Sequence, residues 1–78
     1  MSKADKAIKN GAKSAGAQNF QFEKHGNKYR RASMEINGTT CTIFKIPTSS
    51  HLDESAIQRK ARDMVRRFTK YNTTTLTW

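Results

Sequence analysis

The stretch KYRRASMEINGTTCTIFKI, residues 28–46, carries the strongest fold signal in the chain. Its centre is the dipeptide Asn37-Gly38, with segments of alternating apolar and polar residues on both sides. An Asn-Gly pair in this setting is typical of a two-residue β-hairpin, because both turn positions need a positive φ. Pro47 ends the second segment, since proline has no N–H to donate to a strand ladder. The stretch therefore predicts two antiparallel strands, residues 28–36 and 39–46.

Alternation also assigns faces to these strands and predicts a third strand before them. In the first strand of the hairpin the residues expected on one face are Ala32, Met34 and Ile36, and in the second strand Thr42, Phe44 and Ile46 are expected on one side. Upstream, residues 19–25 alternate, with Phe20 and Phe22 on a buried aromatic face, and residues 26–27 supply a turn. Three antiparallel strands in a meander follow from this order.

Apolar residues at helical spacing lie on both sides of the meander, over residues 3–15 and 53–69. Asp53 is the expected N-cap of the second helix, with a contact between Leu52 and Ile57 beside it. The expected apolar positions are Ala4, Ile8, Ala12 and Ala15 in the first helix and Ile57, Ala61, Met64, Val65 and Phe68 in the second. Gly11 weakens the first helix, which therefore needs packing against the domain or a ligand.

These elements predict an α+β fold of order α-β-β-β-α, a three-stranded antiparallel sheet packed against two helices. A chain of 78 residues has room for one domain only, which we place at residues 1–71. Residues 72–78 form a Thr-rich tail in which Leu76 and Trp78 alternate. Three outcomes stay open for this tail: an edge strand, a cover for the core, or disorder.

The chain is strongly basic, with 15 Lys and Arg against 6 Asp and Glu, a net charge of +9 and a pI of about 10.2. Such a charge favours an acidic polymer as partner, RNA or DNA, although it also serves solubility. The candidate nucleic-acid-binding residues are Lys28, Tyr29, Arg30, Arg31, Arg59, Lys60, Arg62 and Arg66. One side of the first helix carries four lysines, Lys3, Lys6, Lys9 and Lys13. Two interpretations stay open for them: they follow a phosphate backbone, or they form an ordinary solvated face.

Other chemistry finds little support in the sequence. Cys41 is the single cysteine and falls in a predicted strand, where a buried, inert thiol is the ordinary outcome. No Cys/His cluster has zinc spacing and no glycine-rich loop is suited to a nucleotide, so we expect neither metal nor cofactor. Apolar runs are too short for a signal peptide or a membrane span. We expect a cytoplasmic protein.

Several short motifs together resemble the HicA-like toxin family and, more loosely, double-stranded-RNA-binding domains. They are GNKYRR at 26–31, INGT at 36–39, IPTSS at 46–50, and the pair Arg66-Arg67 in the last helix. The resemblance implies an α-β-β-β-α fold and, for the toxins, messenger-RNA cleavage restrained by an antitoxin. The toxins' Gly-Ser-His motif is replaced here by Gly26, Asn27 and Lys28, so Lys28 stands at the position of the catalytic histidine.

Two alternatives to nucleic-acid binding remain open. The first is a metal-independent, HicA-like ribonuclease, for which His25 and Lys28 are the candidate catalytic residues and His51 is the other histidine in the chain. The second is a phage- or bacterium-encoded modulator whose basic surface binds an antitoxin or another acidic protein.

Overall fold

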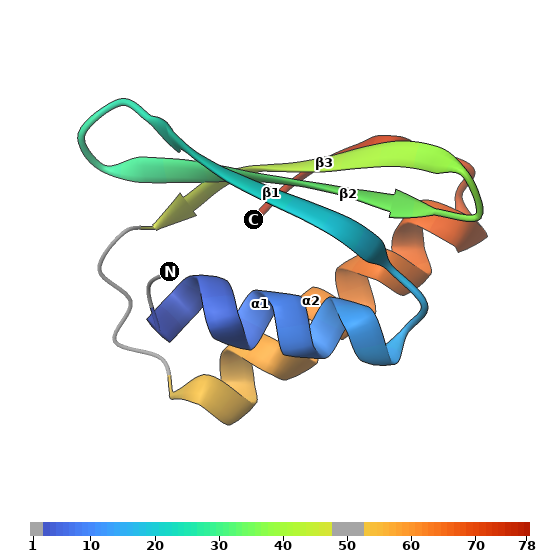
Figure 1. The fold of residues 1–78 in the computed structure, drawn as a ribbon, viewed down its shortest axis with the longest axis horizontal. Helices are drawn as coiled ribbons and strands as arrows, with labels where there is room; N and C mark the ends of the chain where they lie inside the picture. The colour runs from blue at the N-terminus through green and yellow to red at the C-terminus, as the bar shows by residue number, and fades with distance from the viewer. Residues whose placement is uncertain (1–2, 48–52) are drawn as a thin grey trace.

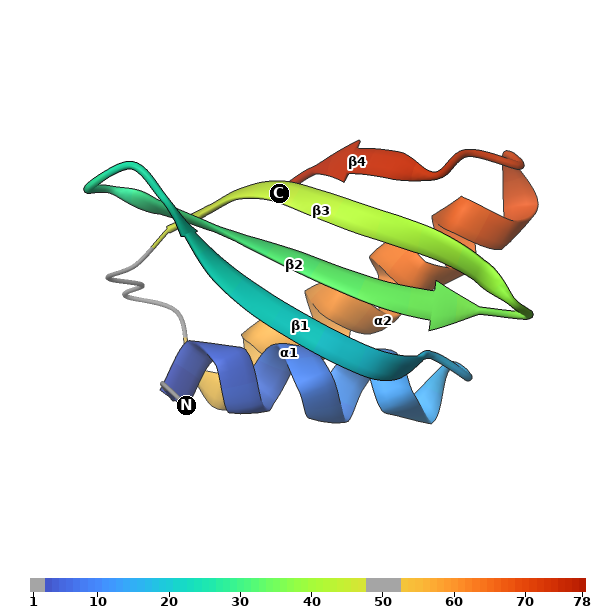
Figure 2. The ribbon, with the colours of Figure 1, turned by 45° about the horizontal axis from the view of Figure 1, so that its top comes forward.

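The computed structural model describes residues 3–47 and 53–78, and it places both helices on one face of a four-stranded sheet (Figure 1). The elements are α1 (Lys3–Ser14), β1 (Gln18–His25), β2 (Tyr29–Ile36), β3 (Thr39–Pro47), α2 (Glu54–Lys70) and β4 (Thr75–Thr77). The predicted α+β class and the order of its first five elements are confirmed. The helices leave the opposite face of the sheet open to solvent (Figure 2).

The β2–β3 hairpin forms as its turn chemistry predicts. Asn37 has φ 52° and Gly38 has φ 81°, both in the left-handed region that a tight hairpin turn requires. The strand β2 buries Ala32, Met34 and Ile36 against the helices. The predicted inner face of this strand is therefore confirmed.

The predicted face of β3 is wrong over most of its length. Cys41 and Ile43 point into the core, whereas Thr42 and Phe44 lie on the open face. Ala32 pairs with Ile43 but Arg30 pairs with Ile46, so β3 holds one extra residue between these pairs. The extra residue is a β-bulge near Lys45, whose φ of 58° breaks the two-residue period and returns Ile46 to the core.

The sheet has four strands rather than the predicted three, because the C-terminal tail forms β4 and pairs in parallel with β3. Thr42 is opposite Thr75, and the Trp78 N–H donates to the Phe44 carbonyl at 2.8 Å. Leu76 and Trp78 are half-buried and pack against the core. The tail thus both extends the sheet and covers part of the core.

The spacing predicts the buried face of α2 fully and that of α1 in part. In α1, Ile8 and Ala12 are buried as predicted and Ala4 and Ala15 are half-buried, but Asp5, Ala7 and Gly11 are buried as well. In α2 the buried side chains are Ile57, Ala61, Met64, Val65 and Phe68, as predicted. Asp53 caps this helix by accepting a 2.7 Å hydrogen bond from the Ala56 N–H, and Leu52 lies outside the described residues. The aromatic face of β1 is only half-buried, with the Phe20 and Phe22 rings stacked at 6.3 Å. The hydrophobic core therefore lies between one face of the sheet and the two helices.

Gly11 allows α1 and α2 to pack in direct contact. A Cβ built on Gly11 would lie 2.1 Å from the carbonyl oxygen of Gln58, far inside any real atomic contact. That oxygen belongs to the α2 backbone and cannot swing aside as a side chain does. The glycine that weakens α1 as an isolated helix is therefore what lets it pack against α2.

We predict that Gly11→Ala destabilises the protein by about 1–3 kcal/mol, the usual cost of overpacking, even though alanine is the better helix former. Urea unfolding measures this change. Asn10→Ala is the matched control, because Asn10 is exposed on the same turn. The free energy of unfolding of this variant should rise by a few tenths of a kcal/mol, on the order of the difference in helix propensity between alanine and asparagine. A Gly11→Ala protein more stable than wild type would show that the helices are not in this contact.

Candidate nucleic-acid interface

Positive charge is concentrated in the helical layer. Ten of the fifteen basic side chains are on helices, four on α1 and six on α2. They are Lys3, Lys6, Lys9, Lys13, Arg59, Lys60, Arg62, Arg66, Arg67 and Lys70. The single acidic residue of α1, Asp5, is 1 % exposed, so every α1 charge that reaches solvent is positive. The acidic residues of α2 are Glu54 and Asp63, and Asp63 forms no salt bridge within residues 53–78.

The open face of the sheet is close to neutral by comparison. Arg31 forms an ion pair with Glu23 across the β1–β2 pairing and lies over the Phe44 ring at 5.9 Å from its centroid. Glu35 accepts a hydrogen bond from the Asn19 side chain at 2.9 Å. The face offers hydroxyl, amide and aromatic groups, but little net charge to attract a polyanion.

The sequence cluster Lys28 to Arg31 does not form one surface, because neighbouring strand residues point to opposite faces. Lys28 lies in the turn between β1 and β2, and Tyr29 is 42 % exposed at the start of β2. Arg31 is on the open face, while Arg30 points toward the helices. One ligand therefore cannot contact both arginines from the same side of the sheet.

Arg30 is engaged in a partly buried ion pair that links the sheet to α1. Its Nε and Nη2 donate to the two carboxylate oxygens of Asp5, at 3.1 and 2.7 Å. The Arg30 side chain is 21 % exposed, and that of Asp5 is 1 % exposed. This bidentate geometry is the strongest that arginine makes with a carboxylate. Sequence reasoning missed it, although Asp5 stands three residues before the core residue Ile8, on the buried side of α1.

We predict that Arg30→Met lowers the free energy of unfolding by about 2 kcal/mol or more, because it removes the guanidinium that forms a bidentate ion pair with the buried Asp5 carboxylate. Adding Asp5→Ala should recover part of the loss by removing that charge. Arg31→Met is the control, since its ion pair with Glu23 is exposed and such pairs contribute about 1 kcal/mol or less. Equal losses for the two arginine variants in urea unfolding would contradict the structural role of Arg30.

The candidate residues of α2 lie on two sides of the helix. Arg59 and Arg62 line a groove between α2 and α1, and Arg66 is exposed one turn after Arg62. Lys60 is on the other side, with its ammonium 4.7 Å from the centre of the Trp78 ring. The structure therefore brings Arg59 and Arg62 together with α1, and it separates them from the open-face residue Arg31.

The two candidate catalytic residues are near the β1–β2 turn. His25 ends β1 and is exposed, and its ring meets the edge of Phe44 with centroids 6.1 Å apart. Its pairing partner in the sheet is Tyr29. The other histidine, His51, lies outside the described residues, as do residues 48–50 of the IPTSS motif. Residues 3–47 and 53–78 contain no group of three or more His, Cys, Asp or Glu side chains that could hold a metal ion.

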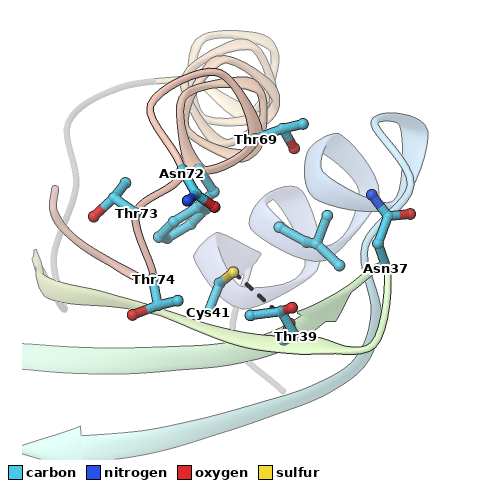
Figure 3. A pocket seen from close by; sticks show the side chains of 9 residues that line it. Asn37, Thr39, Cys41, Thr69, Asn72, Thr73 and Thr74 are labelled. Carbon is cyan, nitrogen blue, oxygen red and sulfur yellow. Dashed lines mark hydrogen bonds between the residues drawn. The ribbon is translucent and has the colours of Figure 1, made fainter.

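A separate cavity of about 220 Å³ lies between the β2–β3 turn and the C-terminal end of α2 (Figure 3). Its lining residues, all uncharged, are Ile36, Asn37, Thr39, Cys41, Phe68, Thr69, Asn72, Thr73 and Thr74. The Cys41 thiol is buried and donates to the Thr39 carbonyl at 3.8 Å. Loss of solvation on burial raises the pKa of the Cys41 thiol above its usual value. The cavity includes none of the candidate phosphate-binding residues.

We predict that Cys41 reacts slowly with iodoacetamide in the folded protein at pH 8, because burial both shields the thiol and disfavours the thiolate. Unfolding in urea should restore the rate of a free cysteine. Mass spectrometry of the alkylated protein over time measures both rates. Equally fast labelling with and without urea would show that Cys41 is accessible.

No protein-family model matches the chain, and neither the curated proteins nor the solved structures contain a match. The resemblance to HicA-like toxins therefore stays a prediction. Within the described residues, neither helix is long and apolar enough to cross a membrane.

Proposed function

We propose that this protein binds nucleic acid, RNA in preference to DNA, along the outer surface of its helical layer. The observation that carries the proposal is the segregation of charge between the two layers. The solvent-reaching charges of α1 are all basic and those of α2 are mostly basic, whereas the open sheet face carries Arg31 paired with Glu23 and a further carboxylate, Glu35. A polyanion is attracted to the side where positive charge is in excess.

The dimensions of the helical layer suit several consecutive phosphates. At 1.5 Å per residue, α1 is about 18 Å long and α2 about 26 Å long. Since nucleic-acid phosphates follow each other at about 3.4 Å of axis per strand, α1 alone spans roughly five steps. Lys6 and Lys13 on α1 and Arg66 on α2 are exposed along this surface. The preference for RNA rests on the resemblance to HicA-like toxins and double-stranded-RNA-binding domains.

The first prediction from this function is a steep dependence of affinity on salt. Fluorescence anisotropy with labelled single-stranded RNA, duplex RNA and duplex DNA, each at several salt concentrations, gives the slope of log K against log salt. Replacing one cation on each helix, in Lys6→Gln/Arg66→Gln, should reduce that slope by between about one and two, since each lost phosphate contact removes about 0.7–0.9.

The matched control is Arg31→Gln/Lys45→Gln, which removes the same charge from strand residues. It should leave the slope and the ranking of the three ligands unchanged. Equal effects of the two double variants would indicate that net charge alone drives binding and that the helical layer is not a specific binding surface. Absence of binding to all three ligands at low salt would contradict the function and favour an acidic protein as partner.

Cleavage is tested in the same samples by following the length of the RNA on a denaturing gel. His25 stands at the end of β1, and its ring contacts Phe44 of β3. Binding through the helices predicts intact RNA with wild type. Shortened RNA, lost in His25→Ala or Lys28→Ala, would instead identify a ribonuclease.

A further inference from the structure

A polar groove runs between α1 and α2 on the solvent side of the helical layer. It has a volume of about 320 Å³ and is lined by Asn10, Gly11, Ser14, Ser55, Gln58, Arg59 and Arg62. Both helices contribute hydroxyl and amide groups to it, and α2 contributes two guanidinium groups. No carboxylate is among the lining residues. The groove is therefore rich in hydrogen-bond donors and positively charged.

Arg62 contains an unsatisfied donor at this groove. Its Nε is buried and has no hydrogen-bond partner among the described residues. A buried N–H that is lost to water and finds no acceptor costs about 1–3 kcal/mol, so such groups are rare in folded proteins. An acceptor that enters the groove would remove this cost, and an anionic acceptor would also interact with the two guanidinium charges.

We propose that this groove is a binding site for one phosphate group, with Arg62 as its principal ligand. The proposal rests on the proposed nucleic-acid function and names the point at which a backbone phosphate is held. The Nε and one Nη of Arg62 donate side by side to two phosphate oxygens, the fork geometry that arginine forms with oxyanions. Arg59 adds charge from the adjacent turn of α2.

The donors on both walls favour phosphate over a protein carboxylate. Asn10 stands on α1, where the Ser14 hydroxyl already donates to the Gly11 carbonyl at 2.7 Å, whereas Ser55 and Gln58 stand on α2. A tetrahedral phosphate directs its oxygens to several sides and can accept from both walls while two oxygens face Arg62. A planar carboxylate has both oxygens on one side and leaves one wall of donors unpaired. Among the described residues that line the groove, none carries an aromatic ring on which a base could stack.

Close packing of the helices sets the width of this site. Gly11 is one of the lining residues, and a Cβ in its place would meet the Gln58 backbone at 2.1 Å. Because Gln58 is itself part of the groove, the contact fixes the α1 donors relative to the α2 donors. Because Gly11 lets α1 and α2 pack closely, the donors of both helices can surround a single phosphate group.

The experiment is a titration of ¹⁵N-labelled protein with inorganic phosphate at constant ionic strength, observed at the arginine Nε–H resonances. The Arg62 resonance, assigned by its loss in Arg62→Lys, should shift downfield with saturation. The Arg66 resonance should stay in place, since Arg66 does not line the groove. An Arg62 resonance that does not respond while others do would overturn the site.

Two further variants test the site without removing Arg62. Ser55→Asp places a carboxylate in the groove, and Ser55 is exposed in the first turn of α2, where an acidic residue is compatible with the helix. It should weaken phosphate binding about tenfold or more, a change on the order of one lost charge-assisted hydrogen bond. Gln21→Glu makes the same charge change on the sheet and should have no such effect. Equal affinities in the two variants would overturn the site.

The same variants separate this site from the wider function. If wild type and Ser55→Asp bind labelled RNA equally tightly, the groove is not the phosphate site although the protein binds nucleic acid. If inorganic phosphate shifts Arg62 but RNA does not bind at low salt, the groove holds phosphate and the nucleic-acid function is wrong. Weaker RNA binding by both Ser55→Asp and Arg62→Lys, with Arg31→Lys on the open sheet face like wild type, is the expected result.

Discussion

The direct contact between Gly11 of α1 and the Gln58 carbonyl of α2 is the constraint on which the rest of the structure depends. It holds the two helices together on one face of the sheet, so that Ile8, Ala12, Ile57 and Ala61 can all be buried beneath them. The same contact leaves the outer sides of both helices facing solvent in a single layer. That outer side carries most of the basic residues, and the fold thereby turns a basic composition into a basic surface.

The protein uses its arginines in two different ways. Arg30 is adjacent to Arg31 in sequence, yet it joins β2 to α1 through the buried carboxylate of Asp5. Within the described residues the arginines of α2 form no salt bridge, and the Arg62 Nε has no hydrogen-bond partner. Burial and pairing therefore distinguish an arginine that stabilises the fold from one that is available to a phosphate, a distinction that net charge alone does not make.

Local signals in the sequence were sufficient for much of the fold. The Asn37-Gly38 turn, the inner face of β2 and the buried stripe of α2 all follow from patterns within a few residues. The inner face of β3 could not be predicted by strict alternation, because the bulge near Lys45 shifts the register and the sequence around it is compatible with either face. The tail could form a strand, but only its pairing with β3 selects that outcome. The groove between the helices depends on residues distant in sequence, so neither Gly11 nor Ser55 stood out as part of a site.

We expect the helical layer, and not the sheet, to contact the nucleic acid. The most direct measurement is a map of backbone amide chemical-shift changes in ¹⁵N-labelled protein during titration with a short RNA duplex. The account predicts that the largest changes cluster at the outer positions of α1 and α2, around Lys6, Asn10, Arg59 and Arg62, with small changes along β1 to β3. Changes concentrated instead at Phe44, His25 and Arg31 on the open sheet face would contradict it.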